Sequence, residues 1–327
     1  MSRKINVPAL WSEQMGAAVA KQQELAANAY STDQSIEQMR QAYERERAFW
    51  NEGGPRPADV RDDAVDTVHG PVPVRVYRPT DAAQLPVIVY VHGGGWVLGG
   101  LDTHDRITRT LACESGAAVV AVDYTLAPEA RFPQALEECA ALVEAIAANP
   151  GRWGAEPDNI SIAGDSGGAS IALGAFLMLR DAGKAASIAS LLLFYGSYGL
   201  RDSASMRLLG GPWDGLTERD LAWYRSQYLR DEADAAHPYV DLLKGDFTYD
   251  VPPCYLVSAA LDPLKDDSAA LATVLNLSGV DVVHDEVDGV IHGFLHHGRI
   301  LDAARQTLSD AAAFHRRHAG VRGRTTH

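Results

Sequence analysis

The sequence predicts an α/β fold in which a mostly parallel sheet is flanked by helices and interrupted by a helical insertion. Two observations carry this prediction. Short apolar runs recur along the chain and mostly alternate with helix-like stretches such as 135–148, a pattern typical of buried parallel strands joined by crossover helices. From about 199 to 250 this rhythm stops, aromatic residues mix with charged ones, and no strand pattern is evident. We therefore expect a helical insertion over the C-terminal edge of the sheet, where open α/β folds bind ligands.

The first elements along the chain are a helix and a hairpin. Between 35 and 50, apolar residues recur near helical spacing among Glu and Arg, and Ser35 with Gln38 resembles a capping box. The Gly- and Pro-rich segment 51–57 then ends this amphipathic helix and marks a boundary. Two alternating runs within 64–77, joined by a Gly-Pro pair, predict an antiparallel hairpin.

Six short apolar runs supply the remaining predicted strands. They are 86–91, 118–122, 160–163, 191–195, 255–259 and 282–287. The stretch 169–179, which follows the third of these runs, is compatible with a helix.

Length and composition fit a folded protein rather than a disordered one. With 327 residues, 46% hydrophobic and 22% charged, the chain can bury a large core as one enlarged domain or as a core with an accessory piece. The N-terminal residues lead into no apolar signal segment, and no later stretch approaches the roughly 20 apolar residues of a membrane span. Cys113, Cys139 and Cys254 are widely separated, which fits neither a disulfide framework nor a zinc ribbon. We expect a cytoplasmic protein that does not enter a membrane.

The charge balance argues against a nucleic-acid partner. The formal net charge is -14, which repels phosphate backbones, and no dense basic block overrides this repulsion locally. The nearest approach to a basic tail is the cluster at 316–318 and 322–324, which we interpret as a frayed and solvated terminus.

A first catalytic motif lies between a predicted strand and a predicted helix. Residues 164–168, Gly-Asp-Ser-Gly-Gly, match the pattern G-x-S-x-G. In a nucleophile elbow, glycines flank a serine held in a strained turn, because side chains there would collide with the neighbouring strand and helix. Ser166 is therefore the candidate nucleophile. The motif alone is weak, since a glycine-rich strand-to-helix turn would give the same pattern.

A second motif is more specific. The sequence His-Gly-Gly-Gly-Trp follows directly on a predicted strand. Glycines let backbone N–H groups converge on one point, where two of them and the N–H after the serine stabilise an oxyanion. The motif residues are His92, Gly93, Gly94 and Gly95, and the candidate donors are Gly93, Gly94 and Gly167. A phosphate loop is the rival interpretation, but no Lys-Ser/Thr follows and 95–99 opens no obvious helix.

A serine nucleophile requires a histidine base and a carboxylate, in the chain order Ser, Asp/Glu, His for this fold. Asp262 stands just past the predicted strand 255–259, at the sheet edge where the acid is needed. Taken alone, it would be an ordinary turn residue before proline. His292 follows the predicted strand 282–287 in a loop with nearby glycines, and it fits the base.

The other histidines after Ser166 fit the base poorly, since each falls in a strand, a helix, the insertion or the terminus. They are His237, His284, His296, His297, His315, His318 and His327. A metal site of His292, His296 and His297 is an alternative, but there is no H-E-x-x-H and no obvious carboxylate partner beside them. We expect no metal.

Together these residues resemble the hormone-sensitive lipase-like branch of the α/β-hydrolases and, within it, the bacterial acetyl esterases with the GDXG motif. The likeness covers nearly the whole chain. It rests on the segments 43–53, 92–96, 101–106, 123–129, 164–168, 208–217 and 262–264. Of these, 43–53 and 208–217 belong to the acetyl esterase pattern rather than to the branch at large.

The resemblance implies an eight-stranded, mostly parallel sheet with a helical cap, and hydrolysis of short-chain carboxylic esters without a cofactor. It assigns 1–50 and 199–250 to the cap, and 51–198 and 251–327 to the core. The family's serine, acid and base fall on Ser166, Asp262 and His292, and its oxyanion glycines on Gly93 and Gly94. The chain departs from the branch at Gly167, where Ala is usual, and at Thr125, where Arg is common. A glycine at the oxyanion position could loosen the elbow.

The expected function is thus a serine esterase acting on a small acyl ester. Two alternatives stay open: an amidase or lactonase with the same machinery, and a non-catalytic or moonlighting protein whose cap pocket binds a small molecule or a partner protein. The expected partner is a small-molecule short-chain ester, with neither nucleic acid nor membrane. A regulatory protein partner and a homodimer are left open. Trp96, Trp213 and Trp223 are expected to pack in the core rather than to narrow the pocket.

Overall fold

The computed structural model describes residues 5–319, which contain an eight-stranded sheet of order β1-β2-β4-β3-β5-β6-β7-β8. The strands are β1 (Asp59–Thr67), β2 (Gly70–Arg78), β3 (Leu85–Val91), β4 (Ala118–Val122), β5 (Ala155–Asp165), β6 (Ile188–Phe194), β7 (Cys254–Ala259) and β8 (Val282–Val287). β1 and β2 form the predicted antiparallel hairpin, and β2 is antiparallel to β4. All other neighbours are parallel. The predicted α/β fold with a mostly parallel sheet is therefore confirmed.

The central strands are apolar along their whole length because both faces of the sheet are covered. Every residue of β4, β6 and β7 is buried, whereas β8, at the end of the sheet, is mainly half-buried. A strand covered on both faces needs no polar positions, which is why its sequence reads as a continuous apolar run.

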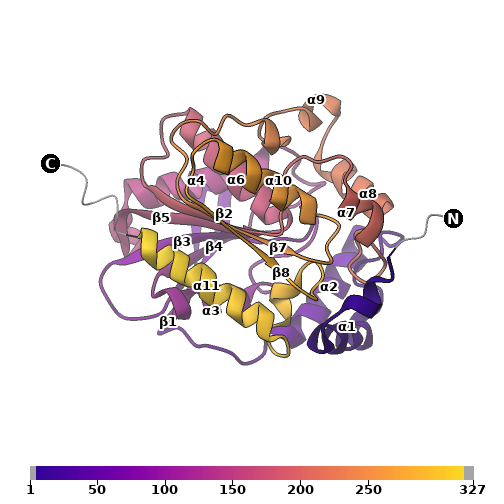
Figure 1. Cartoon of the computed structure of the whole chain (residues 1–327). Coiled ribbons are helices and arrows are strands. Elements are labelled where there is room, and N and C mark those ends of the chain that lie inside the picture. Colours follow the sequence, from indigo (N-terminus) through magenta and orange to yellow (C-terminus); the bar gives the residue numbers. More distant parts are fainter. Residues whose placement is uncertain (1–4, 320–327) are drawn as a thin grey trace.

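Helices cover both faces of the sheet, with α4, α6 and α10 on one side and α3 and α11 on the other (Figure 1). The α-helices are α1 (Glu13–Ala26), α2 (Ile36–Asn51), α3 (Asp105–Ser115), α4 (Gln134–Ala148), α5 (Pro150–Trp153), α6 (Gly167–Asp181), α7 (Ala204–Leu209), α8 (Glu218–Tyr228), α9 (Glu232–Ala235), α10 (Lys265–Leu277) and α11 (Asp302–His318). Short 3₁₀ helices are η1 (Val7–Leu10), η2 (Leu242–Lys244) and η3 (Phe294–His297). Figure 1 also shows α1, α2, α7 and α8 gathered at one end of the molecule.

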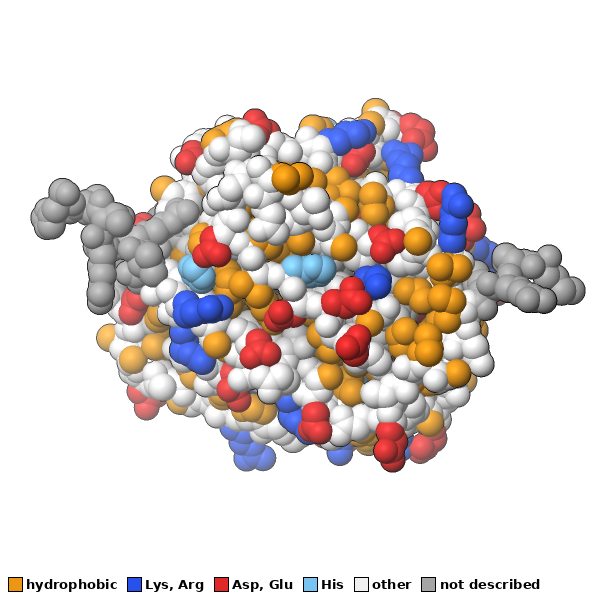
Figure 2. Space-filling view, in the orientation of Figure 1, with side chains coloured by type: hydrophobic (Ala, Val, Ile, Leu, Met, Phe, Trp, Pro, Cys, Tyr) orange, Lys and Arg blue, Asp and Glu red, His pale blue; other side chains and the backbone are white. Residues whose placement is uncertain are grey.

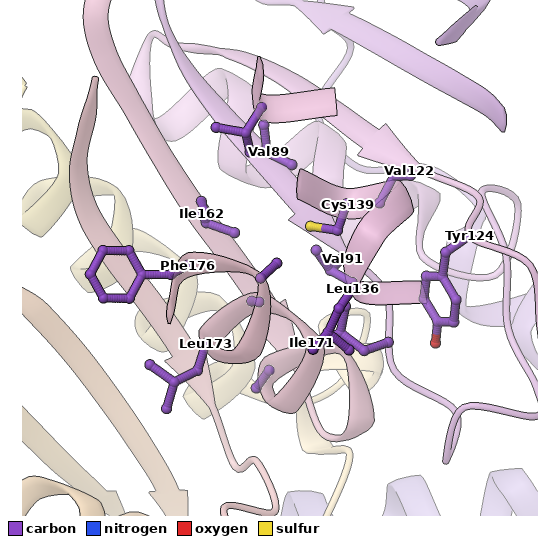
Figure 3. Packing of buried hydrophobic residues seen from close by; sticks show 14 of the residues in the cluster. Val89, Val91, Val122, Tyr124, Leu136, Cys139, Ile162, Ile171, Leu173 and Phe176 are labelled. Carbon is purple, nitrogen blue, oxygen red and sulfur yellow. The ribbon is translucent and has the colours of Figure 1, made fainter. Parts of the chain in front are cut away.

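The larger core cluster lies between the sheet and the pair α4 and α6. Val89, Val91 and Ile162 project from the strands toward these helices, which contribute residues such as Ile171 and Cys139 (Figure 3). All five side chains are fully buried. Since α6 begins at the candidate nucleophile, this packing fixes the position of its first turn relative to the sheet.

The helix predicted near 35–50 is α2, and its N-terminus has the predicted capping box. The Ser35 side chain accepts from the backbone N–H of Gln38, and the Gln38 side chain accepts from the N–H of Ser35. An earlier helix, α1, packs against α2. The segment between β6 and β7 holds α7, α8, α9 and η2 and no strand, as expected for 199–250.

The basic cluster near the C-terminus differs from its prediction. Arg316, Arg317 and His318 form the last turn of α11 rather than a frayed tail, because the helix continues to bury residues such as Phe314 and His315. Residues 322–324 and His327 lie outside the described residues, as does the start of the chain at 1–4.

The surface charges, the cysteines and the lengths of the helices can be compared with the expectations from composition. Acidic and basic side chains are interspersed on the face shown in Figure 2. All three cysteines are free. No helix within residues 5–319 is both long enough and apolar enough to span a membrane.

Candidate active site

Ser166 stands at the sharp turn between β5 and α6. Its backbone adopts φ 53° and ψ -124°, a strained conformation for a residue with a side chain. Two flanking glycines make the turn sterically possible. A Cβ on Gly164 would lie 2.5 Å from the carbonyl oxygen of Gly168, and one on Gly168 would lie 2.2 Å from that of Val91. The segment 164–168 therefore folds as the predicted elbow.

Asp262 lies in the loop after β7 and His292 in the loop after β8, and together they connect to Ser166. His292 Nε2 lies 2.7 Å from Ser166 Oγ, and His292 Nδ1 lies 2.7 Å from Asp262 Oδ2. The other Asp262 oxygen accepts a hydrogen bond of 2.8 Å from the backbone N–H of Leu264, which fixes the carboxylate. The three residues selected from the sequence thus form one hydrogen-bonded chain, from a fully buried carboxylate to a partly exposed hydroxyl.

The surroundings of His292 favour its protonated form. Burial, the largest single effect, lowers the pKa of His292. The charge and hydrogen bond of Asp262, together with the charges of Asp214 and Asp165, raise it, and the net pKa lies above its usual 6.5. A histidine tuned in this way takes a proton from a hydroxyl more readily and holds it as a cation beside its carboxylate.

The glycine loop after β3 lies against this chain, but one of its amides is already used. The N–H of Gly93 donates to Asp165 Oδ1 at 2.9 Å, and the Tyr90 hydroxyl donates to the same oxygen at 2.8 Å. The Gly93 amide is therefore already engaged in this structure, and the oxyanion role expected for it stays a prediction. The physical reason for this engagement is that Asp165, which is 2% exposed, requires donors of its own. Gly94 and Gly167 are left as candidate donors.

The remaining glycines of the loop are required by its shape. Gly94 has φ 122°, and a Cβ there would lie 2.2 Å from the carbonyl oxygen of Leu98. Gly95 has φ 59°, and a Cβ there would lie 2.5 Å from the Tyr224 ring. The His92 ring stacks on the Tyr124 ring with centroids 4.3 Å apart, and this contact holds the start of the glycine loop in place. At Gly167, an added Cβ would come 3.3 Å from Trp96, a close but not prohibitive contact for the alanine usual in this branch.

A cavity of about 60 Å³ opens onto Ser166 and His292. It is lined by Gln22, Tyr30, Tyr43, Arg47, Gly94, Gly95, Leu98, Asp165, Ser166, Trp213, Asp214, Leu216, Tyr224, Ile291, His292, Gly293, His296 and His297. Trp213 lines the pocket, against the expectation that it packs only in the core, whereas Trp223 packs against the main core cluster as expected. Arg47 and Asp214 belong to the segments 43–53 and 208–217 that resemble the acetyl esterases, but nothing in the sequence predicted that they line this pocket.

Asp214 brings a second buried carboxyl group into this pocket. It is 7% exposed, its Oδ1 accepts from the backbone N–H of Leu216, and its Oδ2 has no hydrogen-bond partner among residues 5–319. Burial raises the pKa of Asp214 to about 7, although the hydrogen bond from Leu216 opposes this shift. The group is therefore protonated below neutral pH in the folded protein.

Asp214→Asn should weaken the pH dependence of stability between pH 4 and 7. A carboxyl whose folded pKa is raised stabilises the fold below its unfolded pKa and loses that contribution as pH rises through the folded pKa. For a shift from 3.8 to about 7, the loss is at most about 4 kcal/mol. Melting temperatures at pH 5 and pH 8 check this. The drop between them should be smaller for Asp214→Asn than for the parent or for Asp202→Asn, an exposed control; equal drops would contradict it.

The structure also bears on the metal alternative. The predicted combination of His292, His296 and His297 does not form a cluster of possible metal ligands. Within residues 5–319, the cluster that forms is His104, Asp165 and His296, whose ligand atoms lie within 4.8 Å of one another. His104 Nε2 lies 3.4 Å from Asp165 Oδ1, and Thr103 Oγ1 lies 2.8 Å from His104 Nδ1. These contacts suit a buried His–Asp pair behind the glycine loop.

The eight-stranded sheet and the serine elbow define the α/β-hydrolase class. A family model described as alpha/beta hydrolase fold matches residues 88–296, and the chain belongs to this family. The acetyl esterases of Salmonella schwarzengrund and Salmonella typhi are each 42% identical to it over 312 residues, 95% of this chain and 96% of theirs.

Solved structures lead to the same class. A hyperthermophilic esterase from the archaeon Pyrobaculum calidifontis is 34% identical, with a TM-score of 0.88 over 94% of this chain and 98% of that one. A thermophilic carboxylesterase cloned from a metagenomic library is 32% identical, with a TM-score of 0.84 over 88% and 99%. The chain is therefore a carboxylic ester hydrolase.

Proposed function

We propose that this esterase hydrolyses short-chain acyl esters, acetyl esters first among them, with Ser166 as nucleophile, His292 as base and Asp262 as the group that orients the base. The observation that carries the proposal is the hydrogen-bonded chain of Asp262, His292 and Ser166, with 2.7 Å at both links. Similarity to the Salmonella acetyl esterases over 95% of the chain supports the acetyl preference.

The proposed reaction has two halves. His292 takes the Ser166 proton as the serine oxygen bonds to the ester carbonyl carbon, and the carbonyl oxygen gains the negative charge. The amides of Gly94 and Gly167 stabilise this oxyanion. When the C–O bond to the alcohol breaks, His292 gives its proton to the leaving oxygen. Water, deprotonated by His292, then attacks the acyl carbon. The bond from that carbon to Ser166 Oγ breaks, His292 returns the proton to Ser166, and the carboxylic acid leaves.

Activity should fall steadily from acetate to longer acyl chains, because the cavity beside Ser166 holds about 60 Å³ and has room for only a few non-hydrogen atoms. We expect kcat/KM for 4-nitrophenyl esters to drop by about tenfold or more between acetate and octanoate, since strain from overpacking costs about 1–3 kcal/mol. Steady-state kinetics over the series from acetate upward check this. A rise toward the longest chain would contradict the acetyl preference.

We further propose that 1–50 and 199–250 together form the cap of the active site, over a core of 51–198 and 251–327. Both segments supply walls of the catalytic pocket: Tyr43 and Arg47 come from α2, and Trp213 and Tyr224 from the insertion. The ring centroids of Trp11 and Trp213 lie 6.0 Å apart, and Thr32 donates to Asp220 at 2.8 Å; both contacts tie the N-terminal segment to the insertion.

A further inference from the structure

A second and much larger cavity lies beneath the insertion, beside the catalytic pocket but lined by different residues. Its volume is about 680 Å³, against about 60 Å³ for the catalytic pocket. This volume falls in the range of small-molecule sites, roughly 300–1,000 Å³. Trp96 and Tyr228 stack in its wall, with ring centroids 4.8 Å apart and an interplanar angle of 6°. Ser170, one helical turn beyond Ser166, also lines it.

The cationic groups of this cavity are only partly neutralised. Four arginines line it, and two of them have carboxylate partners: Arg201 pairs with Glu232 at 3.1 Å and Arg230 with Asp234 at 2.6 Å. The other two arginines have no ion pair within 4 Å in the part of the chain that the structure describes.

These two arginines bind backbone carbonyls instead. Arg131 Nη1 donates to the carbonyl oxygen of Leu229 at 2.7 Å, and Arg225 Nη2 donates to that of Leu200 at 2.9 Å. Burial lowers the pKa of Arg225, Asp267 partly offsets this effect, and the nearby Arg201 lowers the pKa further. A half-buried guanidinium beside a like charge gains from the arrival of an anion.

The acidic groups of the cavity are already occupied. Asp231 accepts from the backbone N–H groups at the start of α9, Glu232 holds Arg201, and Asp241 pairs with Lys244 at 2.7 Å. Four arginines against three acidic residues leave the lining of this cavity with a net positive charge, in a chain of net charge -14.

We propose that the cavity binds an organic anion: a carboxylate paired with Arg131 and Arg225, carried on an apolar or aromatic body that packs against Trp96 and Tyr228. Arginine suits this role because its planar fork matches a carboxylate, and aromatic rings suit a flat apolar body. The anion is either a carboxylate-bearing part of the ester substrate or a separate ligand. The pairing chemistry is the same for both sources.

Benzoate tests this proposal, with benzamide as its uncharged counterpart. Isothermal titration should show saturable binding of benzoate and at least about tenfold weaker binding of benzamide, since the uncharged amide cannot form the charge-assisted hydrogen bonds that a carboxylate makes with arginine. Arg225→Gln and Arg131→Gln should each weaken benzoate binding by about tenfold. Arg207→Gln is the matched control. The Arg207 side chain is exposed and pairs with Asp202 outside the cavity, so this variant should bind benzoate as the parent does. Melting curves identify any variant that fails to fold, in which case the other arginine variant decides.

Kinetics separate the two sources of the anion. If benzoate raises KM for 4-nitrophenyl acetate, the anion belongs to the ester substrate; if KM is unchanged while benzoate still binds Ser166→Ala, it is a separate ligand. Equal affinity for benzoate and benzamide, or benzoate affinity within twofold of the parent in folded arginine variants, would overturn the proposal. Turnover of 4-nitrophenyl acetate without benzoate tests the esterase mechanism independently, because this ester carries no carboxylate.

Discussion

Ser166→Ala should reduce kcat for 4-nitrophenyl acetate by at least about 10⁴-fold while leaving the fold intact. The substitution removes the only atom that bonds covalently to the acyl group in the proposed reaction, and loss of a triad member in serine hydrolases typically costs factors of this size. The Ser166 side chain caps no backbone N–H of α6, so its removal breaks no helix-stabilising bond. Initial-rate assays and thermal melts of the purified protein provide the measurements.

Ser170→Ala is the matched control for this substitution. Ser170 lies one turn further along α6. Its hydroxyl donates to the carbonyl oxygen of Ser197 at 2.6 Å and, at 3.5 Å, to the backbone carbonyl of Ser166, but to no side chain of the proposed triad. It should retain most of its turnover of 4-nitrophenyl acetate. If Ser166→Ala kept turnover comparable to that of Ser170→Ala, the nucleophile would have to be another residue.

Asp262→Asn should lower kcat by about 10³- to 10⁴-fold and change the pH profile of what remains. The amide removes the charge that stabilises protonated His292, and it can hold the imidazole in the wrong tautomer. Because Asp262 raises the pKa of His292, its loss lowers that pKa, so the acid limb of kcat/KM should move to lower pH.

Asp266→Asn serves as the control, since Asp266 Oδ2 accepts from the backbone N–H of Ser205 and contacts no triad member. A purely structural role of Asp262 would reduce activity without moving the acid limb. An acid limb at the same pH in Asp262→Asn and the parent would therefore contradict the proposed role.

Most of the sheet could be predicted from the sequence because its strands are buried on both faces. Continuous apolar runs such as 118–122 coincide with β4, and the end of β5 at the glycine motif was evident for the same reason. Helix α1 was harder to detect, since only Met15, Ala18, Val19 and Gln22 are buried in it and most of its apolar residues are alanines, which mark a buried face weakly. The turn at His296 and His297 is a short 3₁₀ helix rather than part of a longer helix.

The site shows where prediction from the sequence ends. Ser166, Asp262 and His292 each follow a recognisable strand, and their chain order is that of the fold, so their meeting could be foreseen. The hydrogen bond from Gly93 to Asp165 could not, because a motif does not reveal which amide a buried carboxylate will take. Nor could the presence of Asp214 and Arg47 in one pocket, since only the folded cap brings segments so far apart in sequence together.

The hydrogen bond between Ser166 and His292 joins residues 126 positions apart in the chain, and the one between His292 and Asp262 joins residues 30 apart. Closing loops of this length costs conformational entropy that the local hydrogen bonds of a helix do not, so these contacts depend on the folded sheet. A nascent or partly unfolded chain can thus have native helices and still lack a working nucleophile. In the proposed mechanism hydrolysis therefore requires the completed sheet, and we expect ester turnover to report on global folding more strictly than helix content does.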